Sequence, residues 1–313
     1  MTAEALRIAL PPGYRVQDAL AFHGRDAQAL GERVEGTRIR KGVLLDGVAL
    51  VLDVRIDADA GVAECLVDIG DTGDSGGAGA PAGARVSARA REAIAGMLGL
   101  RIDPAAFARF IADDTLFAPL VARRPGLRVI QAATVFEALT WAIIGQQINL
   151  PFAISLRRSF IEQAGRAHPS GLWCYPEAVD VARLDIEQLT SRKFSRAKAE
   201  TLLRLARLVA DGALDLAPDL AHAASGDPDA VSARLLAVKG IGPWTVNYAL
   251  LRGYGYPDCS LHGDVAVRSA IGRLLGSQTR PSIAEAEAFL QAYRPHRTMA
   301  AAYLWASLDT SAA

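Results

Sequence analysis

The sequence predicts an α+β N-terminal domain, residues 1–84, followed by a mostly α-helical domain, residues 85–313. In residues 48–57 the apolar side chains alternate with a period of two, and a similar run follows a polar turn, which is typical of a β-hairpin. Residues 71–84 are rich in Gly, Ala and Pro, and we expect a loop there, at the end of the first domain. From residue 86 onward the apolar residues recur with helical spacing.

The composition excludes several classes of protein. With 313 residues the chain is long enough for two or three domains. No apolar run reaches the roughly 18 residues of a membrane span, and the N-terminus lacks the pattern of a secretory signal, so we expect a cytoplasmic protein without a membrane partner. Cys65, Cys174 and Cys259 are too few and too scattered for a disulfide framework, a four-cysteine zinc site or an iron–sulfur cluster.

The net charge is zero, because 34 basic residues balance 34 acidic ones. This balance counts against a protein that coats nucleic acid through a strongly positive surface. It is compatible with a protein that binds a few phosphates through a local patch or through backbone amides.

Helices are expected at residues 87–100 and 103–114, the second of which opens with Asp-Pro. Residues 185–212 read as a further pair of helices. A basic turn at residues 192–198 joins this pair. It either contacts phosphate or forms a solvated charged face.

Capping signals define the two helices between these segments. Thr134 and Glu137 form a capping-box pattern for a helix that should end near residues 145–147. Asn149 is the expected cap of the next helix, and Gly165 follows the end of that helix.

Two later helices are joined by an unusually short turn. One is expected to begin at Asp227 and Pro228 and to end at Gly240, and the next begins at once with Pro243 in its first turn. The turn, Lys-Gly-Ile-Gly, forces a compact hairpin, and its glycines supply backbone angles that other residues resist. Unpaired N–H groups at the start of the second helix would suit one DNA phosphate. The alternative is a plain glycine-containing turn between packed helices.

Several ordered motifs support the first interpretation. The hairpin reads LAVKGIGPWT (236–245), and Asp264 follows it at a helix start. Other motifs are RPGLRV (124–129), FEALTWAIIGQQI (136–148), AKAETL (197–202) and RPHRTMAAAYLWASL (294–308). Together they resemble the helix-hairpin-helix DNA glycosylase superfamily, and more narrowly the AlkA-type DNA-3-methyladenine glycosylases, or glycosylase II.

The resemblance covers roughly residues 86–308 and extends more weakly to the N-terminal domain. It implies that the helical domain is divided into two subdomains with the active cleft between them. One subdomain would comprise about residues 131–264. The other would combine residues 85–130 with residues 265–313.

Asp264 is the catalytic candidate that the resemblance implies. Cleavage of an N-glycosidic bond builds positive charge on the deoxyribose, and a fixed carboxylate stabilises that charge. The same group can orient or deprotonate the attacking water. An Asp at this place can also be an ordinary helix N-cap, and the two roles are compatible. Asp258 and His262 are expected to be loop residues.

Aromatic residues are expected to form the base pocket. Trp244 and Tyr248 lie four residues apart on one helical face, and Trp305 would join them from the C-terminal helix. Their electron-rich rings would favour positively charged alkylated purines through cation–π contact, although such pairs also occur as core packing. Trp141 and Trp173 are expected to be packing residues.

Position 244 also bears on the type of reaction. Related glycosylases that cut the DNA strand use a lysine in this part of the hairpin to form a Schiff base. Trp244 occupies that place here, so the resemblance implies a monofunctional enzyme that leaves an abasic site.

The remaining site residues are implied by the same motifs. The amides of Gly240, Gly242 and Thr245 would bind a DNA phosphate. The backbone carbonyls of Leu236, Val238 and Ile241 could ligate a monovalent cation, Na or K. Gln147 or Ile148 would be the wedge that fills the gap left by the flipped base. Alternatively, Gln146 and Gln147 only satisfy helix-end backbone groups.

The sequence therefore predicts a monofunctional DNA glycosylase that excises alkylated purines, such as 3-methyladenine and 7-methylguanine, in base excision repair. Its partner would be double-stranded DNA with a damaged base, it would require no cofactor, and we expect a monomer. One alternative is an oxidised-base glycosylase of the 8-oxoguanine type, against which Trp244 argues. The other is a non-catalytic hairpin protein that binds damaged DNA, against which Asp264 argues.

Overall fold

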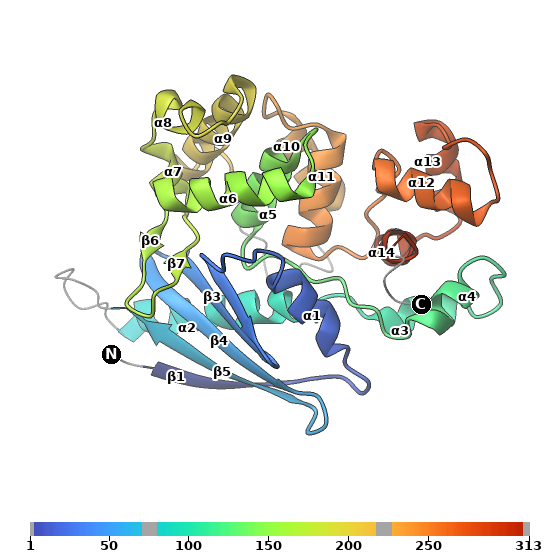
Figure 1. The fold of residues 1–313 in the computed structure, drawn as a ribbon, viewed down its shortest axis with the longest axis horizontal. Coiled ribbons are helices and arrows are strands. Elements are labelled where there is room, and N and C mark those ends of the chain that lie inside the picture. The colour runs from blue at the N-terminus through green and yellow to red at the C-terminus, as the bar shows by residue number, and fades with distance from the viewer. Residues whose placement is uncertain (1–2, 71–79, 217–226, 309–313) are drawn as a thin grey trace.

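The computed structural model describes residues 3–70, 80–216 and 227–308, and it shows an antiparallel sheet followed by a helical region (Figure 1). The elements of the first part are β1 (Ala3–Ala9), α1 (Val16–His23), β2 (Glu32–Glu35), β3 (Arg38–Leu45), β4 (Val48–Asp57) and β5 (Val62–Ile69). The strands lie in the order β1-β5-β4-β3-β2, and all pairs are antiparallel. No helix among these described residues is long and apolar enough to span a bilayer.

The predicted hairpin is confirmed as β4 and β5, in which Val54 lies opposite Cys65. Leu50, Leu52, Val54 and Ile56 are buried, whereas Arg55 and Asp57 are exposed. The alternating pattern of the sequence therefore corresponds to one face that packs against the core.

The predicted loop at residues 71–84 is partly wrong, because α2 (Ala80–Met97) begins before its end. Residues 71–79 lie outside the described residues. Ala90, Ile94 and Met97 of α2 are buried in the same apolar cluster as the sheet, so packing against the sheet supports this helix. The division of the chain at residue 84 stays a prediction.

The helical region follows. Its elements are α3 (Pro104–Phe110), α4 (Ala118–Arg123), α5 (Val135–Gly145), α6 (Leu150–Ala164), β6 (Arg166–Ala167), β7 (Trp173–Cys174), α7 (Ala178–Ala182), α8 (Ile186–Thr190), α9 (Arg196–Ala210), α10 (Pro228–Leu236), α11 (Pro243–Ala249), α12 (Val265–Leu274), α13 (Ile283–Gln291) and α14 (Arg297–Ala306). A π-helical turn, Leu250–Tyr254, extends α11. The short β6–β7 hairpin and this π-helical turn were not predicted.

Helix starts agree with the sequence better than helix ends do. The side chains of Asp103, Asn149 and Asp227 each accept a backbone N–H as N-caps. However, α3 ends at Phe110 rather than at residue 114, and α10 ends at Leu236 rather than at Gly240.

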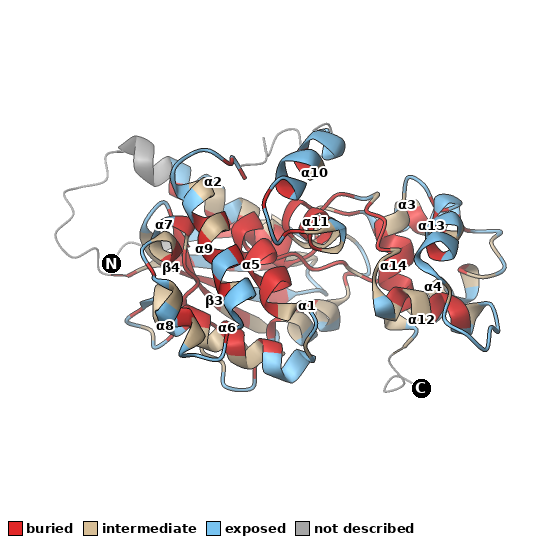
Figure 2. Cartoon of the chain, turned by 90° about the horizontal axis from the view of Figure 1, so that it is seen from above, coloured by how far each residue is buried: buried red, intermediate tan, exposed pale blue. Residues whose placement is uncertain are grey.

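Helix α5 lies at the centre of the helical region. All of its residues from Val135 to Ile144 are buried, and Figure 2 shows it surrounded by other elements. Both overall views place α3, α4, α12, α13 and α14 together at one end of the molecule (Figures 1 and 2).

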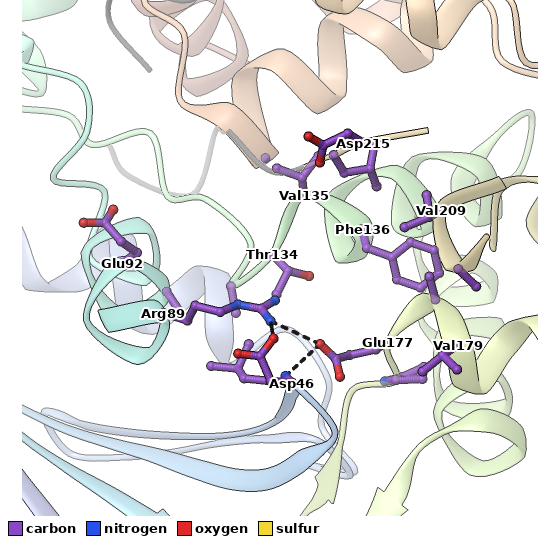
Figure 3. A pocket seen from close by; sticks show the side chains of 18 of the residues that line it. Asp46, Arg89, Glu92, Thr134, Val135, Phe136, Glu177, Val179, Val209 and Asp215 are labelled. Atoms are coloured by element: carbon purple, nitrogen blue, oxygen red, sulfur yellow. Dashed lines mark hydrogen bonds and ion pairs between the residues drawn. The ribbon is translucent and has the colours of Figure 1, made fainter. Parts of the chain in front are cut away.

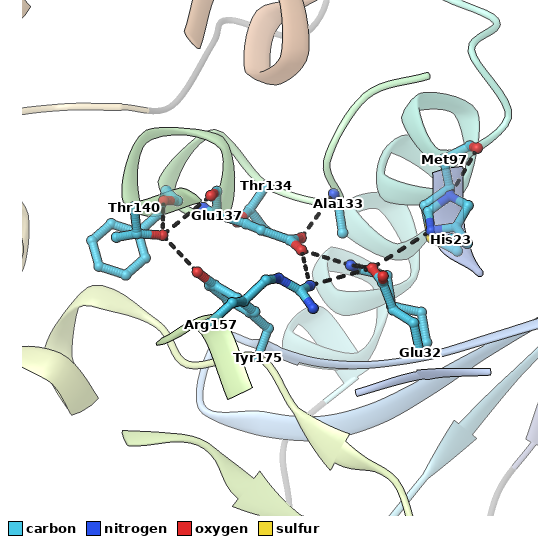
Figure 4. Close-up of polar contacts among 11 residues, drawn as sticks. His23, Glu32, Met97, Ala133, Thr134, Glu137, Thr140, Arg157 and Tyr175 are labelled. Carbon is cyan, nitrogen blue, oxygen red and sulfur yellow. Dashed lines mark hydrogen bonds and ion pairs between the residues drawn. The ribbon is translucent and has the colours of Figure 1, made fainter. Parts of the chain in front are cut away.

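A cluster of buried charges joins the sheet to α5 and α6 (Figure 4). Lys41 of β3 forms ion pairs with Glu32 of β2 and, at 2.7 Å, with Glu137 of α5. Arg157 of α6 pairs with Glu137 at 2.7 Å and with Glu32 at 3.4 Å. All four side chains are buried, so they balance one another's charge in place of water.

These contacts set the pKa values of the two carboxyl groups. Burial alone would raise the pKa of Glu32, but Lys41 and Arg157 hold it well below its ordinary value. The same two cations lower the pKa of Glu137 against the effect of its burial. Both carboxyl groups are therefore ionised at neutral pH.

The capping-box prediction for α5 is half right. The Thr134 hydroxyl accepts the N–H of Glu137 at 3.0 Å, as expected. The Glu137 carboxylate, however, accepts from the N–H of Ala133 at 3.1 Å and from Lys41 and Arg157. Oε1 accepts from the two cations and Oε2 from the residue before the N-cap, so the capping box is not completed.

Candidate active site

The helical hairpin joins α10 to α11 through residues 237–242. Gly240 has φ +98°, and an added Cβ there would lie 2.1 Å from the hydroxyl oxygen of Thr201. Glycine is therefore required at this position by both backbone conformation and space. Gly242 is the N-cap of α11, and it has φ −105° and no atom within 4 Å of an added Cβ.

Gln146 connects this hairpin to the α5–α6 junction. Its side-chain amide donates to the carbonyl of Gly240 at 3.3 Å and to the hydroxyl of Thr245 at 3.0 Å. The neighbouring Gln147 is exposed with φ +55°, whereas Ile148 is partly buried against the core. Gln146 thus has a backbone-binding role, and Gln147 is the more exposed of the two wedge candidates.

Asp264 is the N-cap of α12, as the sequence indicated. Its Oδ1 atom accepts the backbone N–H groups of Ala266 at 2.9 Å and Val267 at 3.0 Å. The indole N–H of Trp305 also donates to Oδ1, at 3.1 Å. The indole N–H of Trp244 donates to Oδ2 at 2.9 Å, so donors fix both carboxylate oxygens.

The predicted aromatic residues form part of a closed circuit of contacts around this carboxylate. The rings of Trp244 and Tyr248 lie 5.4 Å apart. Tyr248 lies near enough to Arg252 to oppose the lowering of the Arg252 pKa by burial, and the Arg252 guanidinium lies 5.7 Å from the ring of Trp305. Trp305 returns to Asp264 through its indole N–H. The structure thus brings together Asp264 and all three predicted aromatic residues.

Sequence reasoning missed Arg252, although a signal was present. Trp244, Tyr248 and Arg252 are spaced four residues apart, which places successive members of the series on one face of a helix.

The two residues expected to belong to the loop before α12 both contact neighbouring side chains. Asp258 pairs with Arg297 at 2.7 Å, and His262 hydrogen-bonds to the hydroxyl of Ser260.

The basic turn at residues 192–198 has only part of its charge available for phosphate. Lys198 donates to the carbonyl of Ile144 at 2.7 Å, and burial lowers the pKa of this lysine. Arg196 pairs with Glu200 at 3.2 Å. Lys193, which has φ +70°, is exposed.

A wide cavity of about 960 Å³ lies elsewhere, lined by residues of the β3–β4 turn, α2, α5, α7 and the segment after α9 (Figure 3). Within it Arg89 pairs with Asp46 and, at 3.5 Å, with Glu177. Glu177 also accepts the N–H of Gly47 at 2.7 Å. The cavity lining shares no residue with the Asp264 circuit. Because Arg89 already pairs with two carboxylates there, we assign the cavity no chemistry.

The chain matches the family model for the HhH-GPD superfamily base excision DNA repair protein over residues 140–295. This range contains the hairpin and Asp264. Trp305 lies beyond its end, and the buried charge cluster lies only partly within it.

Two relatives come from Bacillus subtilis. YfjP, whose provisional description is DNA-3-methyladenine glycosylase, is 31% identical over 197 residues, which are 63% of this chain and 67% of the relative. A protein named DNA-3-methyladenine glycosylase is 34% identical over 183 residues, 58% of this chain and 59% of the relative.

Among solved structures, the 3-methyladenine DNA-glycosylase from Archaeoglobus fulgidus has a TM-score of 0.76 and 21% identity, over 96% of this chain and 97% of that one. At this identity the likeness shows the fold, which in both chains includes the N-terminal sheet as well as the helices. The family match and the relatives decide the classification: the chain belongs to the HhH-GPD superfamily of base excision DNA repair proteins.

Proposed function

We propose that this protein is a monofunctional DNA glycosylase that excises alkylated purines, such as 3-methyladenine and 7-methylguanine, from double-stranded DNA. The observation that carries the proposal is the Asp264 carboxylate, held by two indole N–H groups at the start of α12. The names of the Bacillus subtilis relatives support the class of base.

The reaction breaks the bond between the purine and C1′ of the deoxyribose, and the base leaves with the bonding electrons. Positive charge grows on the sugar, and the fixed negative charge of Asp264 stabilises it. Among the described residues, Oδ1 accepts three hydrogen bonds, whereas Oδ2 accepts only that of Trp244. Oδ2 therefore keeps a free lone pair, which can face the sugar or orient the attacking water.

Trp244 supports monofunctionality. It occupies the hairpin position at which a strand-cutting glycosylase would carry its lysine nucleophile, and its N–H is committed to Asp264. The product would be a free base and an abasic site, without a covalent enzyme–DNA intermediate.

The hairpin is the proposed phosphate site. Gly240, Gly242 and Thr245 lie in the turn and in the first turn of α11, where backbone N–H groups lack partners within the helix. Gln146 holds the Gly240 carbonyl and the Thr245 hydroxyl, which fixes the orientation of this segment.

The proposal extends to a monovalent cation, Na⁺ or K⁺, at the same turn. Leu236 is the last residue of α10, and Val238 and Ile241 follow in the turn, where the Val238 carbonyl accepts a hydrogen bond from Ile241 N–H at 3.0 Å. That oxygen therefore keeps a lone pair, and backbone carbonyls are suitable ligands for a hard cation. A bound Na⁺ or K⁺ would add positive charge beside the DNA phosphate.

The proposal includes two helical subdomains with DNA bound at the cleft between them. Asp264 is the N-cap of α12, and its carboxylate accepts indole N–H groups from Trp244 of α11 and Trp305 of α14, which supports this arrangement. Gln147 is the proposed wedge, because it is exposed and lies beside the hairpin anchor Gln146.

The proposal is tested by incubating the protein with duplex DNA that carries a single 3-methyladenine or 1,N6-ethenoadenine. Chromatography of the free bases should show the modified purine, and the strand should break only after alkaline treatment. Borohydride should trap no enzyme–DNA adduct. Absence of base release would contradict the proposed activity, and a trapped adduct would contradict monofunctionality. Release of 8-oxoguanine alone would favour the oxidised-base alternative.

A further inference from the structure

Two arginines, one in the Asp264 circuit and one beside it, carry positive charge. Arg252 belongs to the circuit, and Arg25, which follows α1, lies close enough for its charge to lower the pKa of Arg252 further, in addition to the larger effect of burial. Both arginines lie against aromatic rings. Among the described residues, neither forms an ion pair with a carboxylate.

The arginines and rings form a continuous stack. The Arg25 guanidinium lies 4.5 Å from the ring of Trp141 and 4.1 Å from the ring of Phe22. Arg252 lies 5.0 Å from the same Phe22 ring and 5.7 Å from that of Trp305. The N-terminal part of the chain therefore reaches the candidate active site through the end of α1.

The stack changes what the aromatic rings can bind. A ring attracts a cation through its negative face, and a guanidinium already lies against Phe22 and Trp305. A second cation placed near these rings would gain less attraction and would be repelled by both arginines. The rings remain suitable for stacking a neutral purine, which needs no charge.

Arg252 also has an unused donor. Its guanidinium donates to the carbonyl of Ile130, and its Nε atom is buried without a hydrogen-bond partner in the described part of the chain. The guanidinium therefore keeps its positive charge beside the Trp305 ring, without a carboxylate among the described residues to neutralise it.

We propose that Arg252 and Arg25 are specificity-determining residues that make this site favour neutral modified purines over cationic ones. The inference rests on the proposed function and ranks modified purines by their charge. 1,N6-Ethenoadenine and hypoxanthine are neutral, whereas 7-methylguanine and 3-methyladenine in DNA are cationic. By preference we mean the factor by which the enzyme accelerates release of a base over the uncatalysed release of that base from its nucleoside.

The test compares single-turnover release of 1,N6-ethenoadenine and of 7-methylguanine from otherwise identical duplexes. For each protein variant the rate is divided by that of the wild type on the same duplex, which cancels intrinsic lability. We expect Arg25→Met and Arg252→Met each to raise the ratio of 7-methylguanine to ethenoadenine release by about tenfold, since one nearby charge is removed. Arg25→Lys and Arg252→Lys keep the charge and should leave the ratio within about twofold.

Two controls separate this effect from loss of folding. Arg25 makes no hydrogen bond or ion pair to other described residues, so Arg25→Met tests the charge without removing an anchor. Arg128 lies 5.3 Å from the ring of Tyr14, outside the stack, and Arg128→Met should leave the ratio unchanged. Variants are compared only after thermal unfolding shows a folded protein.

An unchanged ratio in Arg25→Met, with both bases still released, would overturn the inference and leave the proposed function intact. Release of neither base by the wild type would contradict the proposed function and this inference with it. A raised ratio that also appears in Arg128→Met would show a general effect of lost arginines and would overturn the inference as well.

Discussion

Asp264 combines two roles that its sequence position allowed. It caps α12 through Oδ1 and presents Oδ2 to the space beside Trp244. Because Trp244 and Trp305 come from separate helices, their indole N–H groups fix the carboxylate relative to both. We therefore assign these tryptophans a positioning role in addition to the base stacking predicted from the sequence.

If the indole N–H groups position Asp264, then replacing either tryptophan with phenylalanine, which keeps an aromatic ring but has no N–H, should slow base release. Trp244→Phe and Trp305→Phe should each lower the single-turnover rate of base release by about tenfold or more, because a hydrogen bond to a charged group contributes about 1.5–3 kcal/mol. Binding of undamaged duplex should change by less than about twofold. Trp173→Phe, on β7, is the matched control. Unchanged rates in both site variants would contradict the positioning role.

At the residue scale, the sequence predicted those side-chain roles that depend on residues close by in the chain. The N-cap role of Asp264 agrees with the structure, whereas its contacts with Trp244 and Trp305 depend on the packing of separate helices. Glu137 was assigned only to a capping box, because nothing near it in sequence indicates that Lys41 approaches it from the sheet. The contact of Arg25 with the site depends on tertiary packing in the same way.

At the element scale, the α10–α11 hairpin depends on one glycine more than on the other. Gly240 has a positive φ and touches Thr201, whereas Gly242 has neither constraint. The two positions therefore provide a matched pair for mutagenesis.

Gly240→Ala should lower the free energy of unfolding by about 1–3 kcal/mol, since it forces both a strained backbone and a steric overlap. DNA affinity should fall with it. Gly242→Ala should stay within about 1 kcal/mol of the wild type. Adding Thr201→Ala to Gly240→Ala should restore part of the stability. Equal effects of the two glycine variants, measured by denaturant unfolding, would contradict this account of the turn.

Helix starts were predictable because an N-cap uses a side chain and an N–H only a few residues apart, as Asp103, Asn149 and Asp227 show. Helix ends were less predictable. Residues 80–84 were assigned to a loop from composition, yet the chain there begins a helix whose later turns pack on the sheet. The π-helical turn after α11 likewise has no signal in the local sequence.

At the scale of the whole molecule, the buried cluster of Glu32, Lys41, Glu137 and Arg157 connects the sheet with the central helix α5. The same helix ends at the junction that carries Gln146, whose side chain contacts the hairpin. The cluster therefore orients the N-terminal sheet relative to the candidate active site.

Because of this cluster, we expect the free energy of unfolding to decrease at acid pH. The pKa values of Glu32 and Glu137 are lowered in the folded protein from an ordinary value of 4.5, so the unfolded chain binds protons first as pH falls. Their contribution is fully present above pH 4.5 and is lost as pH decreases through the folded-state pKa values. The free energy of unfolding should fall by up to about 1.4 kcal/mol per pH unit for each carboxyl group.

Lys41→Met tests this source of stability. The variant should lose about 3–5 kcal/mol at neutral pH, because two buried carboxylates then share one cation, and its acid dependence should be shallower. The exposed pair Arg196–Glu200 is the control, and Arg196→Gln should change the free energy of unfolding by less than about 1 kcal/mol. An acid dependence of Lys41→Met equal to that of the wild type would contradict the assignment.

The central claim is that Asp264 supplies the charge that drives base release, and the most direct measurement is the single-turnover rate of Asp264→Asn. Asparagine still caps a helix, so the variant should fold and bind DNA as the wild type does. On duplex DNA with one 1,N6-ethenoadenine, we predict a rate of base release at least about a hundredfold lower than that of the wild type. Undiminished release by a folded, DNA-binding Asp264→Asn protein would contradict the claim.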